Sequence, residues 1–77
     1  MKKILCIGYR SWALKIYKNI KKIKKYKVLI ISNKKYFNKK RIYKFYPDVI
    51  LFYGWSWKIK KNIINNFKCY MLHPSPL

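Results

Sequence analysis

Acidic side chains are almost missing from this sequence. One Asp or Glu stands against 20 Lys and Arg in 77 residues, which gives a formal net charge of +19. A strongly basic protein of this kind usually binds nucleic acid or an anionic membrane surface. A second interpretation stays open, because Lys, Ile, Asn and Tyr make up 44 of the 77 residues and are all encoded by A- and T-rich codons. The lysines are spread over helices and loops and form no single stripe, which favours this second interpretation.

Cysteine, histidine and glycine are also scarce. Cys6 and Cys69 have no C-x-x-C spacing and His73 is the single histidine, so a structural zinc site is excluded. Both cysteines lie in apolar runs, where we expect reduced, buried thiols. The two glycines form neither G-x-G-x-x-G nor G-x-x-x-x-G-K-[ST], so a nucleotide is not the expected ligand at the strand ends.

Long apolar runs are absent as well. No run reaches the roughly 20 apolar residues that cross a bilayer. The apolar run that follows Lys2 and Lys3 is similar to a signal peptide, but Tyr9 and Arg10 end it short of about 7 to 15 residues. We therefore expect a cytoplasmic protein with no membrane partner.

The residues that are present predict one small α/β domain, residues 1–77. Short apolar runs at 4–7, 28–31, 49–53 and 68–72 predict buried parallel strands. Helical spacing separates them, which favours a Rossmann-like parallel sheet with flanking helices. A doubly wound fold normally needs more than about 100 residues, so we expect an incomplete sheet of about four strands.

Helical periodicity fills the segments between the strands. Ser11 is the predicted N-cap of the first helix. Its apolar face would be formed by Trp12, Ala13, Ile16, Tyr17, Ile20 and Ile23. Residues 34–46 predict one short helical face, made by Ile42, Tyr43, Phe45 and Tyr46, and a last helix is predicted over 58–66.

Ligands of open parallel sheets bind beyond the carboxyl ends of the strands. Residues 8–11, 54–57 and 73–76 form the three loops at that edge. Trp55 and Trp57 suit a planar heterocycle, although packing against neighbouring loops is the alternative. His73 follows a strand end, where a general acid or base is often placed, and a structural role is again the alternative.

Three segments resemble the folate-dependent formyltransferases. Residues 70–77, Tyr-Met-Leu-His-Pro-Ser-Pro-Leu, are similar to the active-site segment of that family, N-x-H-x-S-L-L-P. Residues 47–57 are similar to the strand and loop before it, and residues 3–13 to the opening strand and helix. The resemblance implies about four strands of a formyltransferase N-terminal domain.

It also implies the chemistry: transfer of a formyl group from 10-formyltetrahydrofolate to an amine, on methionyl-tRNA or an amino sugar nucleotide. His73 matches the catalytic histidine. The cofactor-binding residues implied by the resemblance are Tyr53, Gly54, Trp55, Ser56, Trp57, Ser75, Pro76 and Leu77. No metal is implied.

The sequence departs from the family at two points that matter for catalysis. Met71 stands where the motif has Asn, and loss of one oxyanion donor costs about 10² to 10³ in rate. The catalytic Asp of the family would lie beyond Leu77, and Asp48 is at the wrong end of its strand to replace it. We therefore expect a fragment that is inactive alone, without specific nucleic-acid binding; the alternative is a small basic nucleic-acid-binding protein.

Overall fold

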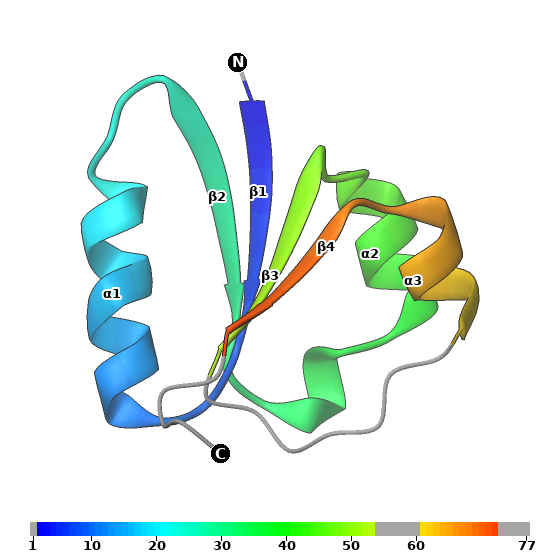
Figure 1. Cartoon of the computed structure of the whole chain (residues 1–77), viewed down its shortest axis with the longest axis horizontal. Helices are drawn as coiled ribbons and strands as arrows, with labels where there is room; N and C mark the ends of the chain where they lie inside the picture. The colour runs from blue at the N-terminus through cyan, green and yellow to red at the C-terminus, as the bar shows by residue number, and fades with distance from the viewer. Residues whose placement is uncertain (1, 54–60, 73–77) are drawn as a thin grey trace.

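Residues 2–53 and 61–72 are described by the structure, a computed structural model. They form a four-stranded parallel sheet with helices on both faces (Figure 1). The elements are β1 (Lys2–Ile7), α1 (Ser11–Lys21), β2 (Tyr26–Ile31), the 3₁₀ turn η1 (Lys34–Tyr36), α2 (Lys39–Phe45), β3 (Val49–Tyr53), α3 (Lys61–Asn66) and β4 (Cys69–Leu72). The predicted α/β parallel sheet of four strands is confirmed.

The strand order is β2-β1-β3-β4, so β1 is paired on both sides. Ile7 lies beside Ile31 of β2 and beside Phe52 of β3. Tyr53, the last residue of β3, lies beside Leu72, the last residue of β4. All pairs are parallel, so the carboxyl ends of the four strands meet at one edge of the sheet.

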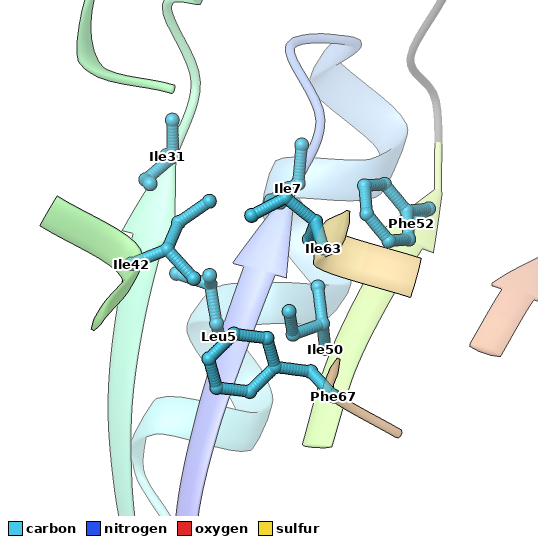
Figure 2. Close-up of a cluster of buried hydrophobic side chains, with 8 residues drawn as sticks. All are labelled: Leu5, Ile7, Ile31, Ile42, Ile50, Phe52, Ile63 and Phe67. Atoms are coloured by element: carbon cyan, nitrogen blue, oxygen red, sulfur yellow. The ribbon is translucent and has the colours of Figure 1, made fainter. Parts of the chain in front are cut away.

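Both faces of the sheet are packed, which explains the unbroken apolar runs of the strands. One face is covered by α1, where Ile4 and Cys6 pack with Ala13 and Tyr17. The other face is covered by α2 and α3 (Figure 1). Its buried cluster comprises Leu5, Ile7, Ile31, Ile42, Ile50, Phe52, Ile63 and Phe67 (Figure 2).

The first helix differs from its prediction at its start and along its apolar face. Ser11 is the first helical residue and not the N-cap; the N-cap is Arg10, whose carbonyl oxygen accepts from Leu14 N–H at 3.0 Å without a side-chain cap. Of the predicted face, Ala13 and Tyr17 are buried, whereas Trp12, Ile16 and Ile23 are 39%, 42% and 41% exposed. Trp12 and Ile16 stay partly exposed because a single helix contacts the sheet along only a narrow part of its surface. Ile23 is exposed because it lies beyond the end of the helix at Lys21.

The segment 34–46 is divided into η1 and α2, each begun by an asparagine cap. Asn33 accepts from Lys35 N–H at 2.9 Å and Asn38 accepts from Arg41 N–H at 2.8 Å. Of the predicted apolar face, Ile42 is buried but Tyr46 is 64% exposed. Tyr46 closes α2 in the left-handed conformation, with φ of 49°, which turns its side chain out of the helical stripe.

The cysteines are free thiols, and Cys6 is fully buried while Cys69 is half-buried. The prediction of a buried thiol is thus confirmed for Cys6 and only partly met by Cys69. None of the described helices is long and apolar enough to cross a bilayer.

Candidate functional site at the carboxyl ends of the strands

One of the nine predicted site residues, Tyr53, lies within the described part of the chain. Gly54, Trp55, Ser56, Trp57, His73, Ser75, Pro76 and Leu77 lie outside the described residues. Their predicted roles stay predictions. The described residues define the strand ends from which both predicted loops begin.

Tyr53 and Leu72 end neighbouring strands at the same level of the sheet. Residue 54 follows Tyr53 in the chain and residue 73 follows Leu72. The predicted cofactor loop and the predicted catalytic segment therefore begin from adjacent strand ends.

Trp12 contacts the predicted cofactor residue Tyr53 directly. The two ring centroids are 4.5 Å apart and the ring planes are inclined by 79°, an edge-to-face pair. Trp12 belongs to the first turn of α1, so the helix that follows the first loop reaches the end of β3. Sequence reasoning placed Trp12 in the core and missed this contact; its position just after the first carboxyl-end loop was the available signal.

Gly8 allows the first loop to pass close to β3. A Cβ atom at Gly8 would lie 1.9 Å from the carbonyl oxygen of Tyr53, so any side chain here collides with backbone. The Gly8 N–H also donates to the Ile31 carbonyl oxygen at 3.1 Å. The turn after β1 is thus held against both neighbouring strands.

The Tyr17 side chain of α1 contacts the carboxyl ends of β1 and β3. Its buried hydroxyl donates to the Ile7 carbonyl oxygen at 2.7 Å and lies 3.3 Å and 3.4 Å from the carbonyl oxygens of Leu51 and Tyr53. Burial raises the pKa of Tyr17 well above its usual value, so the phenol stays a neutral donor. The sequence placed Tyr17 in the core correctly but gave its hydroxyl no role, although a buried Tyr usually needs a hydrogen-bond partner.

β4 is one of the two edge strands of the described sheet, and part of each of its faces is exposed. Tyr70 and Met71 are about half-exposed, on opposite faces. Cys69 shares a side with Met71 but packs against the buried cluster, and burial raises its pKa.

Asp48 lies at the amino end of β3, away from this edge. Its Oδ2 accepts from the Lys3 main-chain N–H at 2.7 Å, and its own N–H donates to the Lys3 carbonyl oxygen at 2.8 Å. Asp48 therefore fastens β3 to the start of β1. The predicted position of Asp48 at the amino end of its strand is confirmed.

The fold matches the structure of the methionyl-tRNA formyltransferase from Clostridium thermocellum. The TM-score is 0.86 at 33% sequence identity, over 95% of this chain and 33% of that chain. The fold is that of a formyltransferase N-terminal region. The chain spans about a third of the length of the formyltransferase it matches. No protein-family model and no curated protein sequence matches it.

Within this formyltransferase fold, the described residues build the support for a site at the carboxyl edge. Gly8, Trp12 and Tyr17, all from the β1–α1 unit, contact or approach Tyr53. Tyr53 is thereby fixed at its backbone and at its ring. Tyr53 is partly buried, and its pairing with Trp12 places two aromatic rings at this edge.

Proposed function

We propose that this chain supplies the N-terminal part of a folate-dependent formyltransferase. The enzyme would transfer a formyl group from 10-formyltetrahydrofolate to an amine, in the cytoplasm. The match to a methionyl-tRNA formyltransferase over 95% of the chain carries the proposal. Methionyl-tRNA is accordingly the first acceptor to test, and an amino sugar nucleotide is the second.

Different residues would bind the cofactor and remove the proton. The paired rings of Trp12 and Tyr53 would contact the planar pterin, and Gly54, Trp55, Ser56 and Trp57 are the further residues that we expect to bind the cofactor. His73 would remove a proton from the attacking amine. The amine nitrogen forms the new bond to the formyl carbon, the bond from that carbon to folate N10 breaks, and N10 receives a proton. Ser75, Pro76 and Leu77 would contact the cofactor.

The chain alone should not catalyse this reaction. Its one carboxylate side chain is Asp48, which is bound to the main chain of Lys3 at the far end of β3. The second acid–base group that the family uses is therefore not supplied by these residues. Purified chain mixed with 10-formyltetrahydrofolate and methionyl-tRNA should give no formylmethionyl-tRNA, and measurable turnover would contradict this part of the proposal.

Complementation tests the role of the chain directly. The chain is co-expressed with the remaining two thirds of the Clostridium thermocellum enzyme, and formylmethionyl-tRNA is measured. We expect activity with the wild-type chain and with the surface variant Lys15→Gln, and a loss of at least about 10²-fold with His73→Ala. Equal activity of the His73→Ala and wild-type chains would refute the catalytic role of His73, and no activity in any pair would refute the proposed function.

A further inference from the structure

A shallow groove at the amino ends of β1 and β2 gathers cationic side chains around an apolar floor. The groove has a volume of about 290 Å³ and is lined by Lys3, Lys27, Leu29, Arg41, Lys44 and Phe45. We call these six residues the basic groove. Its cations converge from three elements, β1, β2 and α2, while Leu29 and Phe45 pack against the buried cluster beneath.

A second hollow continues the cationic surface along α2. It has a volume of about 330 Å³ and shares Arg41 and Lys44 with the basic groove, adding Lys40 and Asn38. Among the described residues, no carboxylate lines either hollow. The positive charge of this surface is therefore not balanced by carboxylates of the residues that line it.

The arrangement of Lys3 and Lys27 costs stability in the free protein. The two residues are direct partners in the β1–β2 register, and like charges opposite each other in a sheet repel. The nearby carboxylate of Asp48 is already bonded to the main-chain N–H of Lys3. With one acidic residue for 20 basic residues, side-chain carboxylates of the chain cannot neutralise the groove.

Two of the cations lie near aromatic rings. The Lys3 ammonium lies 6.0 Å from the centroid of the Phe45 ring, and the Arg41 guanidinium carbon lies 4.9 Å from the centroid of the Tyr36 ring. Such contacts restrict the side chains before any ligand binds. A guanidinium fixed in this way presents its planar fork of donors to phosphate oxygens.

We propose that the basic groove binds a nucleotide phosphate, with the phosphates among Lys3, Lys27, Arg41 and Lys44 and the base over Leu29 and Phe45. Several cations around one apolar surface suit a ligand that joins a compact, multiply charged anion, such as a phosphate, to a flat group, such as a base. This site lies at the amino ends of the strands, opposite the carboxyl edge, so the inference does not depend on the proposed formyl transfer. A free nucleotide and the phosphorylated end of a nucleic-acid strand both present a phosphate attached to a nucleoside, so either could supply this ligand.

Calorimetric titration of the full chain with ADP in about 0.15 M salt, where charges screen over about 8 Å, tests the site. We expect one ADP per chain, weaker binding of pyrophosphate because it leaves the apolar floor uncovered, and no binding of adenosine. The double variant Arg41→Gln with Lys44→Gln should bind ADP at least about tenfold more weakly. The control, Lys15→Gln with Lys24→Gln, removes the same charge from exposed positions outside the groove and should change affinity less than about twofold.

A second variant distinguishes loss of ADP binding from loss of folding. Lys27→Gln removes one cation of the groove and also the repulsion with Lys3, so the variant should bind ADP more weakly while unfolding at an equal or higher temperature. A 5′-phosphorylated oligouridylate is titrated beside ADP, and the tighter of the two identifies the source of the phosphate. Equal loss of ADP binding in the groove and control variants would show diffuse attraction only. Displacement of ADP by an equally charged polyglutamate would show a carboxylate site, and either result overturns the proposal.

Discussion

The hydroxyl of Tyr17 donates a hydrogen bond of 2.7 Å to the main-chain carbonyl oxygen of Ile7, the last residue of β1. The same hydroxyl lies 3.4 Å from the carbonyl oxygen of Tyr53. A side chain of α1 thereby connects to the carboxyl ends of two adjacent strands. The free energy of this contact can be measured, because removing one oxygen atom leaves the ring in place.

We expect Tyr17→Phe to lower the free energy of unfolding by about 1 to 2 kcal/mol, since the buried carbonyl oxygens lose their donor. Tyr43→Phe is the matched control. The Tyr43 hydroxyl accepts from Asn66 Nδ2 at 2.9 Å in an exposed position, and its loss should cost less than about 0.5 kcal/mol. Urea unfolding of both variants gives the comparison, and equal losses would show that the Tyr17 hydroxyl has no special role.

Replacing Gly8 with alanine should be much more costly. The new Cβ would lie 1.9 Å from the Tyr53 carbonyl oxygen, and a backbone atom can move away only if β3 shifts. We expect a loss of about 3 kcal/mol in the free energy of unfolding. A loss below about 1 kcal/mol in thermal or urea unfolding would mean that the two strands are further apart than described.

The Asn38 cap of α2 can be compared with Ser11, which the sequence predicted as a cap but which is the first helical residue of α1. The Asn38 side chain accepts from Arg41 N–H at 2.8 Å at the start of α2, so Asn38→Ala should cost about 1 kcal/mol. Ser11 is the first residue of α1 and makes no capping hydrogen bond, so Ser11→Ala should stay within about 0.5 kcal/mol. A larger loss from Ser11→Ala, measured by circular dichroism during thermal unfolding, would restore Ser11 as the cap.

Stability should fall in alkaline solution. Burial raises the pKa of Cys6 from 9.0 to about 12, so between these values the unfolded state loses its proton while the folded state keeps it. The stabilisation is complete below pH 9 and is lost as pH rises towards 12, at up to about 1.4 kcal/mol per pH unit. Unfolding free energies at pH 8, 9.5 and 10.5 should fall more steeply for the wild type than for Cys6→Ala, and parallel curves would contradict the shift.

The repulsion between Lys3 and Lys27 can be reversed by one substitution. Lys27→Glu places opposite charges at partnered positions of β1 and β2, and we expect a gain of about 0.5 kcal/mol in stability. Lys24→Glu makes the same change of net charge at an exposed position outside the strands. If both variants gain equally in thermal unfolding, relief of the overall charge and not the pair is responsible.

The strands were predictable because each contains an unbroken apolar run. β1 and β2 begin two residues before the predicted runs 4–7 and 28–31. The predicted third strand, 49–53, coincides with β3, and α3 lies within the predicted helix 58–66. The apolar face of α1 was predicted too wide, because periodicity shows which side of a helix is apolar but not how far a neighbouring sheet extends over it. That is why Ile16 remains exposed.

The support of the site was less predictable than its location. The sequence pattern located the strand ends from which the predicted loops begin, because the strands are unbroken apolar runs in a parallel sheet. It could not show that Trp12 contacts Tyr53 or that the Tyr17 hydroxyl reaches the carbonyl oxygens of Leu51 and Tyr53, because these contacts join residues more than 30 positions apart. The roles of His73 and residues 54–57 stay predictions.

The strand order β2-β1-β3-β4 also bears on synthesis at the ribosome. The first strand made becomes an inner strand, the second pairs with one of its edges and the third with the other, and the fourth pairs with the third. Every new strand thus finds its neighbour already synthesised, and none has to be inserted between two paired strands. The sheet can grow outward as the chain emerges, which shortens the time that its apolar runs stay exposed to aggregation.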